Sequence, residues 1–418
     1  MPKRLIDGTI SPSLGGSEEE VLFILQHREE DVRTVALLAA KNPAIDGRYV
    51  AEQIAGWQKA RTKLPTWATV EGIVYPPQIA MEQCSSETTA QYKTATALRW
   101  SRFFQSPTLF VDLTGGFGVD HYYLAKAFDR SIYIERQEAL CETARHNFQF
   151  LGLPHTEVVC GDSTALLPTL PHASLIYADP ARRDTHGART YAISDCTPDV
   201  CALLPTLLLQ CDILLLKLSP MLDWHQAVSE LNSAAEATVV REVHIVATGN
   251  ECKELLLVLS KQAEGSMMQV MCVNDGQTFS FTPEDIVADP HTGGEILAGG
   301  YLYEPNAAIM KAGCFAEMCH RYALNAIAPN SHLFTGGDRI EDFPGRMFCI
   351  RAVTSMNKQE LRAVLQGVTQ ANITVRNFPM TVADLRKRLK IKEGGDIYIF
   401  ATTSADKRHL LLVCDKIG

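Results

Sequence analysis

The sequence lacks the features that mark membrane, secreted and zinc-binding proteins. No apolar run approaches the roughly 20 residues needed to span a bilayer, and the start, MPKRLIDGTISPS, has no apolar signal segment. The 12 cysteines form no CxxC pair, and the intervals Cys196–Cys201 and Cys314–Cys319 match no common zinc spacing. We therefore expect reduced thiols, no bound metal, no membrane association and a cytoplasmic location.

Positive charge is also scarce. Lys and Arg number 39 against 48 Asp and Glu, which gives a formal net charge of -9. This balance argues against non-specific coating of nucleic acid, although it permits a local basic patch. The hydrophobic fraction of 46% and the charged fraction of 21% are ordinary for a globular protein. A length of 418 residues is enough for two or three domains.

Helical and strand-like patterns succeed one another along the chain. Residues 17–64 carry apolar residues at helical spacing and begin with a capping box at Ser17 and Glu20. From about residue 83, apolar runs of strand length alternate with helical stretches, which predicts a parallel sheet covered on both faces. Two runs joined by the GN pair at 249–250 predict a closing hairpin. After residue 266, shorter elements predict an α+β tail.

A glycine-rich turn lies in LFVDLTGGFGVD, residues 109–120. Three glycines follow an apolar run that ends in Asp112, the pattern of a strand, a turn and a helix start that cradles a nucleotide. A P-loop would need a Lys-Ser or Lys-Thr pair where this chain has Val119 and Asp120. Asp120 would also repel the diphosphate of a dinucleotide. Two flanking acids suit a ligand with an ammonium group, such as S-adenosylmethionine (SAM), which the glycines would let approach the backbone.

Acids also end the next three predicted strands. Glu135 is placed to accept bonds from ribose hydroxyls, Asp162 to meet an adenine amine, and Asp179 to close the fourth strand. In a doubly wound sheet the ligand lies outside the carboxyl ends of the strands. A single acid at a strand end is more often a helix cap or turn residue. Four acids in order at these spacings favour a ligand site.

At this point the chain resembles the class I SAM-dependent methyltransferases across residues 83–262. VDLTGGFG is similar to their motif I, with Thr114 in place of the first glycine, and Glu135, Asp162 and DPARR are similar to motifs II, III and IV. EQCSSETTAQYK (82–93) is similar to the segment that closes over the cofactor in RNA-modifying members. Together with the helical N-terminus and GYLYEPNAAIMKAG, these motifs resemble a bacterial group with a THUMP-like C-terminal domain.

The resemblance implies a fold, a cofactor and a substrate. The fold is α/β, with a Rossmann-like seven-stranded methyltransferase domain at 83–265 between a helical N-terminal domain at 1–82 and two α+β segments, ferredoxin-like at 266–330 and THUMP-like at 331–418. SAM is the cofactor, and structured RNA (tRNA or rRNA) is the substrate because THUMP domains bind RNA. The implied cofactor-binding residues are Lys93, Asp112, Thr114, Gly115, Gly116, Gly118, Asp120, Glu135, Arg136, Asp162, Ser163 and Asp179.

The acceptor chemistry is read from the residues around the fourth and fifth strands. DPARR has no aromatic residue to stack a base, which disfavours an exocyclic amine as acceptor. Arg182 and Arg183 suit a phosphate or a polar base edge, or else pair with acids in the next loop. Leu218 stands where a C5-pyrimidine enzyme would carry its cysteine nucleophile, and this disfavours that mechanism.

A ribose 2′-O mechanism remains open. Lys93, Asp179, Lys217 and Glu254 occur in the order of the Lys-Asp-Lys-Glu tetrad of FtsJ-like enzymes, although DPARR differs from their motif IV and Lys93 could instead bind the SAM carboxylate. We therefore expect Asp179, Arg182 and Lys217 to be catalytic.

The tail carries a local basic segment. We expect RNA-binding residues in RNFPMTVADLRKRLKIK, with Phe378 nearby to stack a base, and the alternative is a solvated helix face. Including the motif IV arginines, the expected RNA-binding set is Arg182, Arg183, Arg376, Arg386, Lys387, Arg388 and Lys390. Rival functions are a protein or small-molecule methyltransferase, a SAM-binding RNA-binding factor without catalysis, and, less favoured, an NAD(P) enzyme.

Overall fold

The structure is a computed structural model that describes residues 16–182, 193, 196–262, 265–283 and 291–417. The chain divides into two compact units, Met1–Arg241 with Leu257–Ser266 and Glu242–Leu256 with Met267–Gly418. None of the 12 cysteines, all of which the structure describes, forms a disulfide. Among the described residues, no helix is both long and apolar enough to cross a bilayer.

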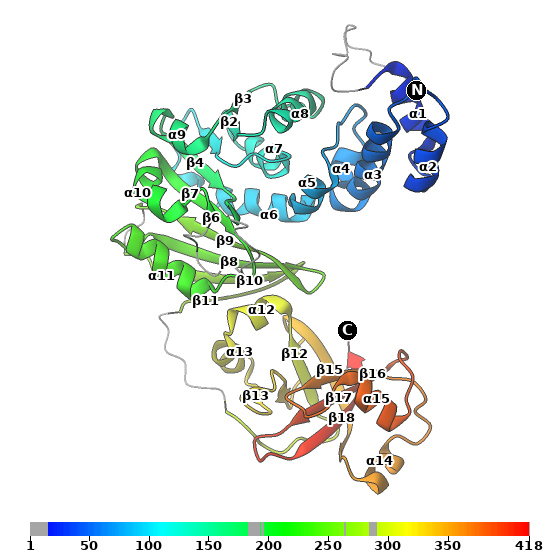
Figure 1. The fold of residues 1–418 in the computed structure, drawn as a ribbon. Coiled ribbons are helices and arrows are strands. Elements are labelled where there is room, and N and C mark those ends of the chain that lie inside the picture. Colours follow the sequence, from blue (N-terminus) through cyan, green and yellow to red (C-terminus); the bar gives the residue numbers. More distant parts are fainter. Residues whose placement is uncertain (1–15, 183–192, 194–195, 263–264, 284–290, 418) are drawn as a thin grey trace. The chain divides into compact units, whose positions relative to one another are not determined.

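The first unit begins with helices, as predicted (Figure 1). The expected capping box is present, because Ser17 accepts the N–H of Glu20 and the Glu20 side chain accepts the N–H of Ser17. Asp31 and Asp46 cap the next two long helices. The helices are α1 (Glu18–His27), α2 (Val32–Ala39), α3 (Gly47–Lys63), α4 (Pro65–Ala68), α5 (Gln78–Gln83) and α6 (Glu87–Leu98), followed by a 3₁₀ turn at Ser101–Phe103.

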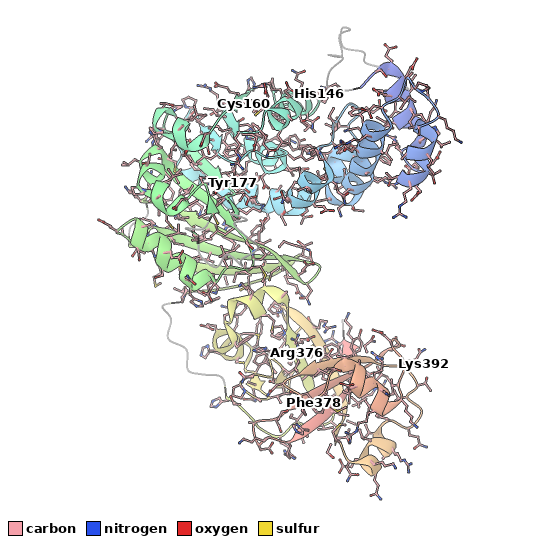
Figure 2. The ribbon with its side chains drawn as sticks, in the orientation of Figure 1. His146, Cys160, Tyr177, Arg376, Phe378 and Lys392 are labelled. Carbon is pink, nitrogen blue, oxygen red and sulfur yellow. The ribbon has the colours of Figure 1, made fainter. Side chains whose placement is uncertain are left out.

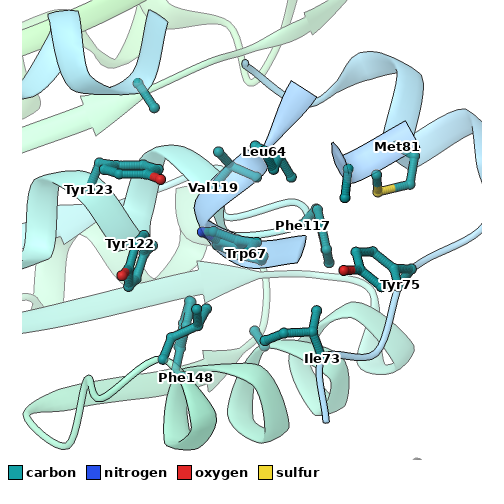
Figure 3. Packing of buried hydrophobic residues seen from close by; sticks show 14 of the residues in the cluster. Leu64, Trp67, Ile73, Tyr75, Met81, Phe117, Val119, Tyr122, Tyr123 and Phe148 are labelled. Carbon is teal, nitrogen blue, oxygen red and sulfur yellow. The ribbon is translucent and has the colours of Figure 1, made fainter. Parts of the chain in front are cut away.

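A cluster of buried aromatic side chains packs these helices against the glycine-rich turn and the elements that follow it. Trp67 of α4 is fully buried, and its ring centroid lies 5.0 Å from that of Phe117 in the glycine-rich turn and 5.5 Å from that of Tyr122. Tyr75 and Phe148 belong to the same cluster (Figure 3). The N-terminal helices therefore help to fix the turn that follows the first strand.

The parallel strands alternate with helices, which confirms the α/β prediction. β4 is buried at every residue, as expected for a central parallel strand. The strands are β1 (Leu109–Asp112), β2 (Arg130–Glu135), β3 (Thr156–Cys160), β4 (Ala173–Ala178) and β7 (Cys211–Leu218), paired in the order β7-β4-β1-β2-β3. The helices are α7 (Val119–Ala125), α8 (Glu138–Phe150), α9 (Ser163–Leu166), α10 (Val200–Gln210) and α11 (Trp224–Ala234), with a 3₁₀ turn at Leu167–Thr169 and a two-stranded ribbon of β5 (Ala181–Arg182) and β6 (Cys196–Thr197).

The closing hairpin forms where the sequence predicts it. β8 (Val240–Thr248) and β9 (Glu251–Leu259) are joined by Gly249 and Asn250, which both have positive φ, as a tight hairpin turn requires. The sheet then grows beyond the expected seven strands to nine, in the order β11-β10-β8-β9-β7-β4-β1-β2-β3. β10 (Gln269–Asn274) pairs parallel with β8, and β11 (Gln277–Phe281) pairs antiparallel with β10.

A second sheet of seven strands organises the tail. Successive residues of its inner strands face opposite sides, so Phe400 and Leu412 join one core while Ile399 and Leu411 join another. Its strands are β12 (Tyr301–Pro305), β13 (Asn325–Ala326), β14 (Phe334–Gly336), β15 (Gly345–Ser355), β16 (Asn372–Arg376), β17 (Ile397–Thr403) and β18 (His409–Ile417), in the order β13-β14-β12-β15-β18-β17-β16.

The tail has four helices among its described residues. The run 306–324 forms two of them, because Gly313 adopts a left-handed φ of 72° and ends the first. The helices are α12 (Ala307–Ala312), α13 (Phe315–Tyr322), α14 (Lys358–Val364) and α15 (Val382–Leu389).

Candidate active site

The turn after β1 is shaped by close packing on aromatic rings. A Cβ at Gly115 would lie 2.2 Å from the ring of Tyr133, which is fully buried on β2. Gly118 has a left-handed φ of 86° at the start of α7, and a Cβ there would lie 2.8 Å from Phe148. These two glycines are therefore required by the fold, in addition to any need for space around a ligand.

Gly116 differs from its neighbours because its outer side is open. The nearest atom to a Cβ at this position would be the carbonyl oxygen of Thr114, at 3.8 Å. Its N–H donates to Oε2 of Glu135 at 3.0 Å, and the N–H of Gln137 donates to Oε1 at 2.9 Å. Glu135 is half-buried at the end of β2. The turn and the second strand end therefore form one open, acidic surface.

Asp112 lies beneath this surface rather than on it. Its side chain is 1% exposed, and Oδ1 accepts the N–H of Thr114 at 3.0 Å. Oδ2 lies 3.5 Å from Nδ1 of His121, a contact too long for a good hydrogen bond, and both ring nitrogens lack a hydrogen-bond partner among the described residues. Burial raises the pKa of Asp112 above its usual value, and His121 opposes that effect.

Asp120 and Lys93 form a buried ion pair. Lys93 Nζ lies 3.1 Å from Oδ1 of Asp120 and 3.0 Å from Oγ of Ser85, and the Lys93 side chain is 0% exposed. Oδ2 of Asp120 accepts the hydroxyls of Ser85 and Tyr177, each at 2.8 Å. Burial alone would raise the pKa of Asp120, but Lys93, Lys217 and the two hydroxyls hold it below its usual value.

This network bears on two expectations, which stay predictions. Lys93 was expected to contact the cofactor or to serve in a catalytic tetrad, but its ammonium is enclosed and bonded to Asp120. Asp120 was expected to meet a ligand ammonium, but its charge is already balanced by Lys93, and its side chain is 11% exposed. The ion pair links α6, which precedes β1, to α7, which follows the glycine-rich turn. Ser85 and Tyr177, which sequence reasoning did not single out, complete it.

The third strand end carries an exposed acid. Oδ1 of Asp162 accepts the N–H of Thr164 at 2.8 Å and its hydroxyl at 2.7 Å, so Asp162 caps the helix α9 that begins at Ser163. The Thr164 hydroxyl and amide together lower the pKa of Asp162. Arg136 is exposed beside Glu135. The capping interpretation of Asp162 is thus correct locally, and its exposure leaves it accessible to a ligand.

Asp179 and Lys217 meet at the ends of β4 and β7. Lys217 Nζ lies 2.5 Å from Oδ2 of Asp179, and the Asp179 side chain is 36% exposed against 13% for Lys217. The N–H of Asp179 donates to Oγ1 of Thr114 at 2.7 Å. Arg182 lies on β5, whose backbone pairs with β6, and Arg183 lies outside the described residues. Glu254, the fourth expected tetrad member, is buried on β9.

Comparison with known proteins shows the family to which the chain belongs. A crystal structure of a protein from Porphyromonas gingivalis W83, assigned as a methyltransferase, is 33% identical, with a TM-score of 0.79, over 96% of this chain and 100% of that one. The family model described as THUMP domain-like matches residues 345–416, and the one described as a ferredoxin-like domain matches residues 301–344. The chain belongs to the class I SAM-dependent methyltransferases that carry a THUMP-like C-terminal domain.

Other solved methyltransferases match in part. A SAM-dependent methyltransferase from Agrobacterium tumefaciens is 14% identical over 42% of this chain and 61% of that one, with a TM-score of 0.31. An rRNA methylase from Streptococcus thermophilus is 14% identical over 40% of this chain and 94% of that one, with a TM-score of 0.30. No curated protein matches the chain.

The THUMP-like domain uses some of its expected RNA-binding residues internally. Arg376 donates to Oε1 of the buried Glu304 at 3.0 Å, and Arg346 pairs with the other oxygen of the same carboxylate. Phe378 is half-buried against the core, with its ring 5.4 Å from that of His409. Arg376 and Phe378, both labelled in Figure 2, therefore make contacts within the fold, and their expected roles in contacting RNA stay predictions.

The cations of α15 are divided between the fold and the surface. Arg386 donates to the carbonyl oxygen of Ala371 at 3.2 Å and is half-buried. Leu385 is fully buried beneath the helix, as the spacing predicts. The exposed cations, which we call the α15 basic face, are Lys387, Arg388, Lys390 and Lys392.

Proposed function

We propose that this methyltransferase acts on structured RNA, either tRNA or rRNA. The observation that carries the proposal is the α15 basic face within a THUMP-like domain, on a chain whose net charge is -9. Clustered cations on an acidic protein are what a polyanionic substrate requires, because neutralising phosphates releases counterions. A small substrate would need no such surface.

The cofactor site is inferred from the open side of the β1 turn. Glu135 is placed to accept the two ribose hydroxyls, because each of its oxygens keeps further acceptor capacity after binding one backbone N–H. Asp162 is exposed at the next strand end, where it could accept an adenine amine. The open space above Gly116 fits a ligand that lies against the backbone. When bound, SAM supplies an electrophilic methyl group.

Asp179 and Lys217 are inferred to act at the acceptor. Asp179 is the more exposed of the two and can accept a hydrogen bond from the acceptor hydroxyl or amine. Lys217 donates to Asp179, and its ammonium can stabilise negative charge on an acceptor oxygen. This assignment replaces the four-residue tetrad, since Lys93 is enclosed.

Each rival function requires only one of the two proposed sites, the α15 basic face or the Asp179–Lys217 pair. A protein or small-molecule methyltransferase would use the same cofactor turn but not the α15 basic face. A SAM-binding RNA-binding factor without catalysis would need that face but not the Asp179–Lys217 pair. Each rival therefore predicts that one of the two sites is dispensable.

The decisive experiment is transfer of label from tritiated SAM to total RNA from cells that lack the gene, followed by digestion to nucleosides. Label in one nucleoside is expected, and its absence in Asp179→Asn would assign the transfer to this site. A 2′-O-methyl nucleoside would favour action of the Asp179–Lys217 pair on a ribose hydroxyl, and a base-methylated one would reject it. No RNA label, with SAM binding confirmed by calorimetry, would overturn the RNA proposal.

A further inference from the structure

Thr114 joins the turn after β1 to the end of β4. Its hydroxyl accepts the N–H of Asp179 at 2.7 Å, and its own N–H donates to the buried Asp112 at 3.0 Å. Asp112 is 1% exposed, so Thr114 is attached on one side to a group that belongs to the core. On the other side it holds the backbone of a residue at the proposed acceptor site.

Asp179 is consequently fixed at two points. Thr114 binds its main-chain N–H, and Lys217 binds its carboxylate at 2.5 Å. A hydrogen bond to the N–H sets the orientation of the peptide from which the side chain departs, and the ion pair sets the far end of that side chain. Two such constraints leave a 36% exposed carboxylate much less freedom than its exposure alone would allow.

The residue type at position 114 is essential to this arrangement. Glycine at this position would offer no hydroxyl. Serine could make the same hydrogen bond, whereas valine has the shape of threonine but cannot accept the N–H. Loss of the hydroxyl would leave the Asp179 N–H without its partner. At a partly buried site, the penalty for an unsatisfied N–H exceeds the net stabilisation that the hydrogen bond itself provides.

We propose that Thr114 is a positioning residue that couples the cofactor turn to Asp179. It holds the Asp179 carboxylate in place for the acceptor while the turn holds the cofactor. This inference rests on the proposed function, because it takes Asp179 to act at the acceptor. It extends that function by assigning to motif I a role on the acceptor side of the site.

The first test needs no acceptor. Amide hydrogen exchange of the peptide that contains Asp179 is compared in the wild type, Thr114→Val and Thr114→Ser. We expect exchange to rise by roughly tenfold in Thr114→Val, the factor that loss of one hydrogen bond supplies, and to return close to the wild-type rate in Thr114→Ser. Thr143→Val is the matched control, because Thr143 is a buried threonine of α8 whose hydroxyl donates to the carbonyl oxygen of Ala139 at 2.8 Å.

The second test measures methyl transfer from labelled SAM to total RNA from cells that lack the gene. In Thr114→Val we expect kcat to fall roughly tenfold while KM for SAM stays within about twofold, and Thr114→Ser to recover most of kcat. A rise in KM with kcat unchanged would overturn the proposal in favour of direct cofactor binding by Thr114. Unchanged exchange in Thr114→Val would also overturn it. Failure of the wild type to label RNA would count against the proposed substrate alone, since the exchange test stands apart from it.

Discussion

Lys93 Nζ lies 3.1 Å from Oδ1 of Asp120, and neither side chain is more than 11% exposed. The pair links α6, which precedes the first strand, to α7, which follows the glycine-rich turn. Charges this deeply buried are tolerated only when each has its partner and the remaining lone pairs are satisfied. Ser85 and Tyr177 provide that satisfaction for Asp120. The stability of this part of the fold should therefore depend on the pair being complete.

The first prediction removes one partner. Lys93→Met should lower the free energy of unfolding by about 3–5 kcal/mol, because it leaves the Asp120 carboxylate buried without compensation. Urea denaturation of both proteins measures the difference. Lys93→Met combined with Asp120→Asn is the control, and it should recover part of the loss because no buried charge then remains. If Lys93→Met alone unfolded at the same urea concentration as the wild type, the ion pair would not stabilise the fold.

The second prediction concerns the pH dependence of the same pair. The folded-state pKa of Asp120 is held below its unfolded value of 3.8. A carboxyl group of this kind contributes stability that is fully present above the unfolded pKa and is lost as pH falls through the folded pKa. The stability difference between wild type and Asp120→Asn should thus be constant above about pH 5 and shrink below pH 3.8. Urea denaturation at several pH values measures this stability difference. If the difference grew on acidification, the pKa of Asp120 would be raised by folding rather than lowered.

The third prediction separates the glycines of the turn. Gly115→Ala should destabilise the protein by about 1–3 kcal/mol or more, since its Cβ would meet the Tyr133 ring at 2.2 Å. Gly116→Ala should cost only about 1–2 kcal/mol, the strain of its left-handed backbone, because the space around it is open. Thermal unfolding compares the stabilities of the two variants. Calorimetry measures their affinity for SAM, and Gly116→Ala should lose more affinity relative to its loss of stability than Gly115→Ala. Equal stabilities would refute the packing argument.

The sequence predicted which strand ends carry acids, because that depends only on where apolar runs stop. It could not predict what those acids touch. Asp112 and Asp120 stand on either side of the same glycines, yet one faces a buried histidine and the other a buried lysine that arrives from α6. Such partners are fixed by how helices dock. No local pattern marks Lys93 as enclosed, since a lysine in an isolated helix is normally solvated.

The same limit explains the tail. The alternation of apolar residues predicted its strands and the inward side of α15. Arg376 and Glu304 are 72 positions apart, and their ion pair exists only in the folded domain. The pairing of β10 with β8 likewise depends on sheet order rather than on local sequence. Composition can show that cations cluster; only tertiary contacts show which ones are left on the surface.

The fourth prediction tests the acceptor-side ion pair. Lys217→Met should reduce kcat for methyl transfer by roughly 10²–10³-fold if Lys217 stabilises negative charge that develops on the acceptor, with little change in SAM affinity. Lys217→Arg keeps the charge and should recover part of the rate. Single-turnover transfer to RNA and calorimetry with SAM measure the two quantities. A parallel loss of SAM affinity in Lys217→Met would place Lys217 at the cofactor instead.

The fifth prediction concerns the α15 basic face. Replacing Lys387, Arg388 and Lys390 by Glu should lower RNA affinity and reduce the salt dependence of binding by about two to three phosphate contacts, while SAM affinity stays unchanged. All three side chains are exposed, and Leu385, which fixes the helix to its core, is untouched. The matched control replaces Arg33, Lys41 and Lys59 by Glu, since these are exposed cations of the N-terminal helical region and give the same change in net charge. If both triple variants weaken binding equally, net charge rather than this face attracts RNA. If only the α15 variant does so, the THUMP-like domain holds the substrate.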